Sequence, residues 1–337
     1  MDIVSAFIYI VVVSRAKHYE NRRGAGIMIS LRHKNIVIIY MLYFGDMVSL
    51  SPFLEILRRE AVGSKITLVI DARFQEAVRY NPCIDTIIPV DRKKVGVYAT
   101  WKLGKEIGKT HPDILMVLHG TMRTFLMAKA MKAKVWVGET GNPLGRFFID
   151  DEILVERRDC HAAEKYVKVL EHLGVSNLAH HGMQMYTCPA WEEGAKAFFA
   201  AEGVKPGDRL AGFSVAAGKL SMGEFIAAAS WCAVAFANDS GPMYVFDSRK
   251  VPVIAMFGPS NAKLHHPLGE KSCALATTDM PRTQDHVNHT IRDKSYTPID
   301  AISVSEAVRA GEWALGMISD ERYEGHLAFV EGNRHGG

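Results

Sequence analysis

The sequence predicts an α/β protein with two doubly wound halves, in which helices cover both faces of each parallel sheet. Short, unbroken apolar runs alternate with stretches of helical spacing, as in parallel sheets that are buried on both faces. The pattern restarts after the turn-forming stretch KPGDR at 205–209. The length of 337 residues also favours two domains, because a domain has about 150 residues.

The first half alternates apolar runs with helical segments. The expected strands are 35–40, 66–70, 86–90, 113–119 and 134–138, with helices at 47–60, 73–81, 94–109 and 121–133. In the first of these helices, Phe53, Leu54 and Leu57 lie close to helical spacing, and Pro52 is tolerated only in the first turns. One further strand is expected at 152–155.

Two amphipathic helices, at 160–174 and 190–203, lead into the second half, and each ends at a glycine. Further strands are expected at 209–214, 233–236 and 251–257, with helices at 225–232, 242–248 and 304–317. Ser303 or Ser305 is expected near the N-cap of the last helix. The expected organisation is an N-terminal extension at 1–34, a first domain with its linker at 35–204, a second domain at 205–320 and a tail at 321–337.

The N-terminal extension contains the apolar run IVSAFIYIVVV at 3–13, which is shorter than the ~20 residues that cross a bilayer. The run also differs from a secretory signal, because Asp2 precedes it and Arg15 and Lys17 follow it. The extension, which need not be ordered, is either a membrane-contacting segment or sequence upstream of a natural start at Met28. We favour the second interpretation.

Composition and charge restrict the class of protein. With 48% hydrophobic and 23% charged residues, the chain is neither fibrous nor disordered. Its five cysteines are scattered and lack CxxC spacing, which argues against a disulfide framework or a structural zinc site and for a reducing compartment. Residues 1–150 hold 22 Lys and Arg against 13 Asp and Glu, an excess of nine positive charges. This asymmetry indicates either a solvated basic surface or an anionic ligand or membrane partner.

Two loops that follow strands carry the residues suited to chemistry, since ligands of doubly wound sheets bind beyond the carboxyl ends of the strands. In MLYFGD at 41–46, Gly45 permits a tight approach and Asp46 precedes a helix. The Asp46 carboxylate either caps that helix or acts as a general base in a cleft, and this stretch alone favours the cap. The loop lacks G-x-G-x-x-G, and the chain has no G-x-x-x-x-G-K-[ST] phosphate loop.

The second loop is NDSGP at 238–242. Its N–H groups, the Ser240 hydroxyl and the Gly241 backbone suit an anion at the start of a helix, and Pro242 fits an early helical position. The same residue types are also typical of a simple capped turn. Asp239 disfavours a bare phosphate there and suits a cap or an acceptor for sugar hydroxyls.

Several stretches, taken in order, resemble glycosyltransferase family 9, which includes the ADP-heptose:lipopolysaccharide heptosyltransferases. They are Gly45-Asp46 with Pro52 and LEILRRE, ITLVI, NPCIDTIIPV, DILMVLHGTMRT, CHAAEKYVKVLEHLGV, NDSGPMY and VPVIAMFGPSN. PIDAISVSEAVRA resembles the closing helix of the family.

The resemblance implies the glycosyltransferase-B (GT-B) fold, with two Rossmann-like domains facing across a cleft, the first for the acceptor and the second for the nucleotide-sugar. It implies an inverting, metal-independent glycosyltransferase without a cofactor. The enzyme would move heptose or a related sugar from an ADP-sugar, such as ADP-heptose, to a lipid-linked acceptor of the lipopolysaccharide inner core. It would work in the cytoplasm at the inner face of the inner membrane, with peripheral membrane contact and no nucleic acid partner. The basic first half suits such an anionic acceptor.

The resemblance also implies roles for single residues. An inverting transfer needs a base for the acceptor hydroxyl and N–H-rich or cationic groups for the departing diphosphate. Asp46 takes the position of the base. The residues expected at the donor phosphates are Ser214, Lys219, Asp239, Ser240, Gly241 and Tyr244. Gly45 is expected at the acceptor, and Arg123 either meets an acceptor phosphate or is a solvated surface residue.

The chain departs from the family pattern at two places. Tyr244 stands where the family usually has His, and a phenol can donate a hydrogen bond but is not a cation at pH 7. After Lys219 the family continues with further strand–helix units, whereas here only one helix fits between the strands at 209–214 and 233–236. One or two units of about 30 residues are therefore absent, and the second domain is expected to be reduced.

The alternatives to a transferase are open at this stage. The reduced second domain and Tyr244 favour a degenerate, non-catalytic GT-B-like protein that binds sugar or lipid. A nicotinamide-dependent dehydrogenase is disfavoured by the missing glycine fingerprint. Four histidines lie near Cys273, but their spacing matches no common zinc site, so no metal is expected; they are His265, His266, His286 and His289.

Overall fold

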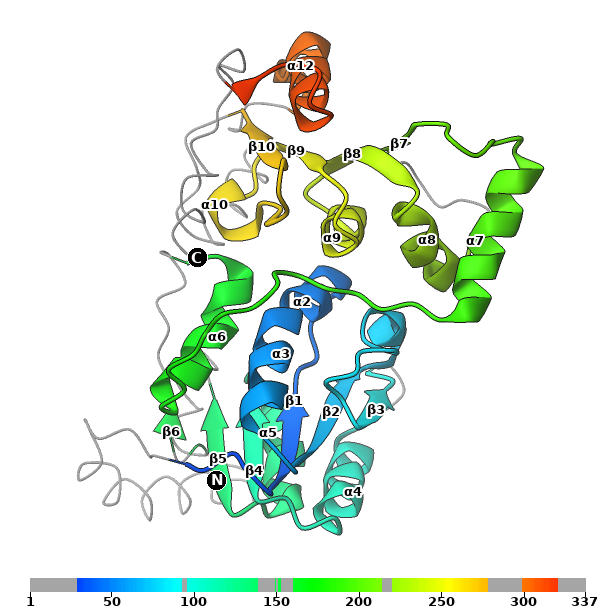
Figure 1. The fold of residues 1–337 in the computed structure, drawn as a ribbon. Helices are drawn as coiled ribbons and strands as arrows, with labels where there is room; N and C mark the ends of the chain where they lie inside the picture. Colours follow the sequence, from blue (N-terminus) through cyan, green and yellow to red (C-terminus); the bar gives the residue numbers. More distant parts are fainter. Residues whose placement is uncertain are drawn as a thin grey trace.

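The computed structural model describes residues 29–92, 96–138, 149, 151–152, 160–213, 220–277 and 299–320. These residues form two parallel β-sheets, one in each half of the chain, with helices packed on both faces (Figure 1). The predicted α/β class with two doubly wound sheets is therefore confirmed.

The first sheet has the strand order β3-β2-β1-β4-β5-β6, and neighbouring strands are parallel throughout. Its strands are β1 (Asn35–Ile39), β2 (Lys65–Asp71), β3 (Thr86–Val90), β4 (Ile114–Val117), β5 (Val135–Gly138) and β6 (Asp151–Glu152). The five apolar runs predicted as strands are confirmed to within two residues. β6 lies at the start of the strand predicted at 152–155, and the rest of that run is outside the described residues.

The helices of the first unit are α2 (Phe44–Ser49), α3 (Ser51–Glu60), α4 (Val97–Gly108), α5 (Met122–Met131) and α6 (Ala162–His172), with the 3₁₀ helix η1 at Ala72–Ala77. The prediction of one helix over 47–60 is wrong, because the chain forms two helices that break at Leu50. Pro52 explains the break: it lacks an N–H donor and lies in the first turn of α3. The short helix predicted at 73–81 is the 3₁₀ helix, which Asp71 caps.

The second sheet has four parallel strands in the order β10-β9-β8-β7. Its elements are β7 (Leu210–Phe213), α8 (Met222–Ala229), β8 (Cys232–Asn238), α9 (Gly241–Ser248), β9 (Val253–Phe257), α10 (Ala262–His265), β10 (Cys273–Ala276), η3 (Ile299–Ala301) and α12 (Val304–Ala314). Within the described residues, α8 is the only helix between β7 and β8, as predicted. The sheet is smaller than the six-stranded first sheet, and β7 forms one of its edges.

Helix caps account for two differences in detail. α8 begins three residues before its predicted start, because Ser221 and Glu224 form a capping box around the first turn. Of the two serines considered for the last helix, Ser303 is the N-cap residue of α12, and its side chain accepts a hydrogen bond from the Glu306 N–H.

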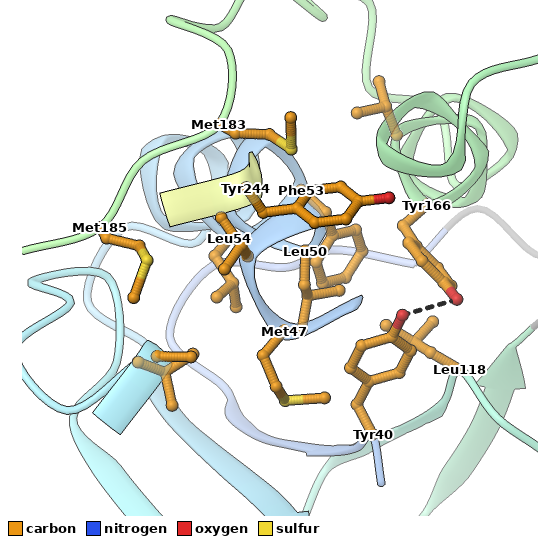
Figure 2. Close-up of a cluster of buried hydrophobic side chains, with 14 of the residues drawn as sticks. Tyr40, Met47, Leu50, Phe53, Leu54, Leu118, Tyr166, Met183, Met185 and Tyr244 are labelled. Carbon is orange, nitrogen blue, oxygen red and sulfur yellow. Dashed lines mark hydrogen bonds between the residues drawn. The ribbon is translucent and has the colours of Figure 1, made fainter. Parts of the chain in front are cut away.

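Successive side chains of a strand point to opposite faces of the sheet, so each face buries every second residue of the strands. Along β1, Ile36 and Ile38 lie in the same apolar cluster as α2, α3 and α6, whereas Val37 and Ile39 join the cluster of α5. The first of these clusters continues across the boundary between the units into α8 and α9 (Figure 2). α12 covers the opposite face of the second sheet, where Trp313 packs near β8 and β9.

α7 (Pro189–Ala201) precedes the predicted domain boundary between residues 204 and 205, yet it packs against α8 of the second unit (Figure 1). A Cβ atom at Gly194 would lie 2.5 Å from the Glu224 carboxylate, and Ala195 shares an apolar cluster with Ala228. The boundary itself stays a prediction, but in space α7 packs with the second unit.

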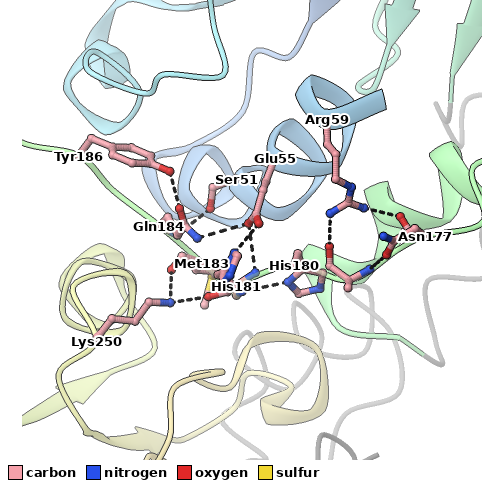
Figure 3. Close-up of polar contacts among 12 residues, drawn as sticks. Ser51, Glu55, Arg59, Asn177, His180, His181, Met183, Gln184, Tyr186 and Lys250 are labelled. Atoms are coloured by element: carbon pink, nitrogen blue, oxygen red, sulfur yellow. Dashed lines mark hydrogen bonds and ion pairs between the residues drawn. The ribbon is translucent and has the colours of Figure 1, made fainter. Parts of the chain in front are cut away.

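The segment between α6 and α7 crosses from one unit to the other along α3, and polar contacts hold it there (Figure 3). Glu55 of α3 accepts a hydrogen bond from the His181 N–H at 3.1 Å, and Arg59 donates to the Ala179 carbonyl at 2.7 Å. From the second unit, the Lys250 ammonium donates to the His181 carbonyl at 2.5 Å. The crossing segment is therefore bonded to elements of both units.

The close packing of α4 on α5 gives a first prediction. A Cβ atom at Gly104 would lie 2.8 Å from the Ala130 Cβ and would press on the Met127 carbonyl oxygen. We expect Gly104→Ala to lower the free energy of unfolding by about 1–3 kcal/mol in urea titrations, because the helices must move apart. Gly96→Ala is the control, since a Cβ there meets nothing within 4 Å, and we expect a change below about 1 kcal/mol. Equal effects of the two variants would contradict the packing argument.

Candidate active site

α2 and α9 meet where the two units face each other. Each helix begins just beyond the carboxyl end of a strand, α2 after β1 and α9 after β8. A Cβ atom at Gly45 would lie 2.7 Å from the ring carbon Cε2 of Tyr244, and one at Gly241 would lie 3.5 Å from Phe44. The helices are thus in contact through their first turns, and only glycine at position 45 leaves room for the Tyr244 ring.

The Tyr244 side chain is buried between the units, and Figure 2 shows it lying over α2. Its hydroxyl oxygen is 3.1 Å from Nδ1 of His265, at the end of α10. Burial, and then the nearby carboxylates of Asp239 and Asp46, raise the pKa of this phenol well above its usual value. Tyr244 is therefore neutral, and its hydroxyl connects α9 to an imidazole. Its contact with the donor phosphates stays a prediction.

Asp46 is half-buried in the first turn of α2. Its Oδ2 accepts a hydrogen bond from the Tyr43 N–H at 3.1 Å, so the carboxylate caps the helix. Burial raises the pKa of Asp46, although the Tyr43 N–H, His265 and Lys165 offset part of the rise. A carboxylate with a raised pKa is a better proton acceptor, and the capping position therefore does not conflict with the predicted role as a base.

The start of α9 contains three of the predicted donor residues, and all three are half-buried: Asp239, Ser240 and Gly241. Ser240 is the N-cap residue, but its hydroxyl donates to the Asn238 carbonyl at 3.2 Å and makes no cap hydrogen bond. The N–H groups of the first turn therefore lack a side-chain cap and are suited to bind an anion. This geometry agrees with the predicted roles, which stay predictions.

The remaining predicted residues are placed differently. Ser214 and Lys219 lie outside the described residues. Gly45 lies beneath the Tyr244 ring, so the structure gives it a packing role, and its contact with an acceptor stays a prediction.

Arg123 lies at the carboxyl end of the first sheet, in the wall of a cavity of about 560 Å³ that we call the arginine cavity. Its lining residues are Met41, Tyr43, Arg73, Arg92, His119, Thr121, Met122, Arg123 and Thr124. Arg123 donates to the Arg92 carbonyl at 2.6 Å. Arg73 pairs with the buried Asp71 at 2.7 Å, and this hydrogen bond holds the pKa of Asp71 below its usual value. Arg92 lies 3.9 Å from the same Asp71 carboxylate, and Arg123 has no ion pair among the described contacts. With three guanidinium groups around one carboxylate, the cavity suits an anionic ligand.

In the parts of the chain that the structure describes, no group of three or more His, Cys, Asp or Glu side chains could hold a metal ion. His265 is bonded to Tyr244, and the His266 ring is bonded to the Pro267 carbonyl. His286 and His289 lie outside the described residues, so the absence of a metal stays a prediction.

Comparisons with known proteins bear on the family and the fold. Residues 191–295 match the model of glycosyltransferase family 9 (heptosyltransferase). The crystal structure of the glycosyl transferase family 9 from Veillonella parvula is similar with a TM-score of 0.80 and 28% identity, over 86% of this chain and 99% of that one. The chain carries a glycosyltransferase family 9 domain. The predicted family and enzyme class, a glycosyltransferase, are thereby confirmed.

Two more distant structures share the fold of this chain. E. coli ADP-heptose lps heptosyltransferase II has a TM-score of 0.59 at 14% identity, over 77% of this chain and 99% of that one. E. coli heptosyltransferase WaaC with ADP has a TM-score of 0.56 at 14% identity, over 78% and 99%. The predicted GT-B arrangement of two Rossmann-like units is confirmed. No curated protein matches the chain.

Several candidate residues of this site escaped the sequence analysis. His265 and Lys165 act electrostatically on Asp46 from α10 and α6, and nothing in the sequence links them to it. Arg73 and Arg92 follow the carboxyl ends of β2 and β3 within two residues. The rule that ligands bind at such ends could have found these two arginines, as it found Asp46.

The burial of Asp46 predicts an unusual dependence of stability on pH. Because the pKa of Asp46 is raised in the folded protein, its ionised form costs stability at neutral pH, and the cost vanishes below its ordinary pKa of 3.8. We expect Asp46→Asn to raise the free energy of unfolding at pH 7, with a gain that shrinks toward pH 4. The measurement is urea unfolding across this pH range.

Asp113→Asn is the matched control, because the Asn35 N–H and then Lys134 lower the pKa of Asp113. Its carboxylate therefore stabilises the folded protein at neutral pH, and this contribution is lost as the pH falls through the lowered pKa. We expect this variant to be less stable than the wild type at pH 7. The same sign for both variants would contradict a raised pKa of Asp46 in the folded protein.

Proposed function

We propose that the protein is an inverting glycosyltransferase that moves heptose or a related sugar from an ADP-sugar to a lipid-linked acceptor of the lipopolysaccharide inner-core type. The observation that carries the proposal is the contact of α2 with α9, which sets the half-buried Asp46 against an uncapped helix start in a family 9 domain. A base and an anion site on facing units are what a transfer between two bound substrates requires.

In this reaction Asp46 accepts the proton of the acceptor hydroxyl, whose oxygen forms a bond to the anomeric carbon of the donor. The bond from that carbon to the diphosphate breaks on the opposite face, and the electron pair leaves with the diphosphate. The N–H groups at the start of α9 stabilise the charge that develops there. We propose that these N–H groups stabilise the leaving diphosphate without a metal ion. Ser214 and Lys219 are proposed to bind the donor as well.

The choice of donor rests on relatives. Solved structures of E. coli heptosyltransferase WaaC hold ADP or ADP-2-deoxy-2-fluoro heptose. At 14% and 15% identity these structures share the fold alone, so ADP-heptose as the donor is part of the proposal. Asp239, Ser240, Gly241 and Tyr244 are the groups that would meet the diphosphate and its neighbouring hydroxyls.

The acceptor is proposed to enter the arginine cavity. Arg73, Arg92 and Arg123 can pair with carboxylate or phosphate groups of an anionic glycolipid. No helix in the described residues is long and apolar enough to cross a membrane. We propose that the protein works from the cytoplasmic side and reaches its lipid-linked acceptor by peripheral contact.

The donor is tested first by nucleotide binding. We expect ADP, but not UDP or GDP, to raise Tm, since a ligand at 100 times its Kd stabilises by about 2.7 kcal/mol. The rate of ADP release from ADP-heptose, measured with a lipid-linked acceptor that carries the inner-core sugar Kdo, should then fall about 10²–10⁴-fold in Asp46→Asn. The ADP-induced shift in Tm should remain. Asp113→Asn is the control and should keep its rate.

Absence of a Tm shift with every nucleotide would contradict the transferase. A shift with ADP but no turnover by the wild type would favour the non-catalytic sugar- or lipid-binding protein instead.

The role of Arg123 is tested by steady-state kinetics. We expect Arg123→Gln to raise KM for the anionic acceptor about tenfold or more with little change in kcat, because a charge-assisted hydrogen bond in binding is lost. The effect should weaken as salt is raised. Lys134→Gln is the control, since the exposed Lys134 pairs with Asp113 outside the cavity. A change confined to kcat would show that Arg123 does not bind the acceptor.

A further inference from the structure

The first three turns of α4 carry a cluster of aromatic, aliphatic and basic side chains, which we call the α4 patch: Val97, Tyr98, Trp101, Lys102 and Lys105, all exposed except the half-buried Trp101. Val97 is 75% exposed and Tyr98 is 73% exposed. The rings of Tyr98 and Trp101 lie 6.2 Å apart. Single exposed apolar side chains are common on protein surfaces, but neighbouring ones form a patch that needs an explanation.

The α4 patch lies beside the arginine cavity. Gly104 of α4 packs on Met127 of α5, and Gly108 packs on Met131. In both pairs the residue of α5 follows that of α4 by 23 positions in the chain. The helices therefore run parallel, and the same offset places the first turn of α4 level with the first turn of α5. That turn contains Arg123 and the exposed Met122, both in the wall of the cavity, and the exposed Tyr43 lies in the same wall.

The charges of this region favour an anionic partner. The Lys105 ammonium lies 3.9 Å above the Trp101 ring, and Lys102 is exposed one residue further along the helix. Glu106, the acidic residue of α4, is paired with Lys109 at 2.6 Å. Asp71 and Asp91 offset part of the arginine charge in the adjacent cavity. Basic side chains around exposed aromatic rings are typical of surfaces that sit at the headgroup level of a bilayer.

We propose that the α4 patch, together with Met122 and Tyr43, docks on an anionic lipid bilayer and holds the mouth of the arginine cavity at the level of the lipid headgroups. The proposal rests on the proposed function, because a lipid-linked acceptor enters a cavity directly only when the cavity opens toward the membrane. It adds the surface and the orientation: the first turns of α4 and α5 face the bilayer, and α12, which Figure 1 shows beyond the second sheet, does not contact it.

Cosedimentation of the full chain with lipid vesicles tests this surface. We expect the wild type to bind vesicles of phosphatidylglycerol and phosphatidylethanolamine, and to bind phosphatidylcholine vesicles much more weakly. Val97→Ser combined with Tyr98→Ser should lower the partition coefficient on the anionic vesicles roughly tenfold. Lys102→Gln combined with Lys105→Gln should lower it about 25-fold at low salt and less at high salt, since each lysine near an anionic surface contributes about fivefold.

The matched control is Val304→Ser combined with Val308→Ser on α12, where the two valines are 80% and 50% exposed. We expect this variant to bind vesicles as the wild type does. Wild-type binding by both α4 variants, or an equal loss in the α12 variant, would overturn the proposal. So would a dimer in analytical ultracentrifugation that disappears in the Val97 and Tyr98 variant, because the patch would then bind a second copy.

The shift in Tm with ADP, measured on each variant, separates this test from that of the proposed function. Loss of vesicle binding with an unchanged ADP shift supports the docking surface. Vesicle binding through the α4 patch by a wild type that binds no nucleotide would support the surface and contradict the transferase.

Discussion

The contact of the Tyr244 ring with Gly45 is the constraint on which the arrangement of the two units depends. Any side chain at position 45 would occupy the space of the ring, so the first turns of α2 and α9 can meet at this distance only through glycine. Asp46 follows in the chain and is thereby held opposite the start of α9. The Tyr244 hydroxyl adds His265 to the same junction. Packing and chemistry are therefore set by the same few residues.

This junction is buried within an apolar cluster that runs through both units, and polar bonds of the crossing segment reinforce it. Glu55 and Arg59 hold the segment on α3, while Lys250 and Arg249 hold it from the second unit. A rotation of one unit against the other would break these bonds together with the apolar contact. Opening of the site therefore has a cost that binding of the substrates would have to offset.

The sequence predicted the strands well, because an unbroken apolar run at the centre of a parallel sheet has few alternative interpretations. It missed β10, since the short run CALA carries little β-branched or aromatic signal. The break at Leu50 depends on Pro52, which the sequence analysis tolerated within one helix.

For the site, the sequence located Asp46 and the loop at 238–242 because both follow strands. It could not decide whether the Asp46 carboxylate caps a helix or acts as a base, because both roles need the same carboxylate. The structure shows that the cap and the raised pKa coexist. His265 could not be predicted as a neighbour of Tyr244, because 21 residues separate them in the chain and only the fold brings the two side chains together. In the sequence it was one of a histidine pair with no partner to suggest a role.

Within the described residues, the second sheet is smaller than the first. The two sheets differ by two strands, and β7, at the edge of the smaller one, is separated from β9 by β8, which leads into α9. At that edge Phe213 is exposed, stacks on Phe236 at 5.2 Å, and lines an apolar cavity of about 580 Å³ beside α12. β8, α9 and the contact with α2 lie within the described residues, so Asp46 and the start of α9, two of the features proposed for the reaction, are present. In the proposed function, a smaller sheet offers less surface beside the start of α9 for the rest of the donor nucleotide. The shortening should therefore weaken binding of the donor more than it slows the chemical step.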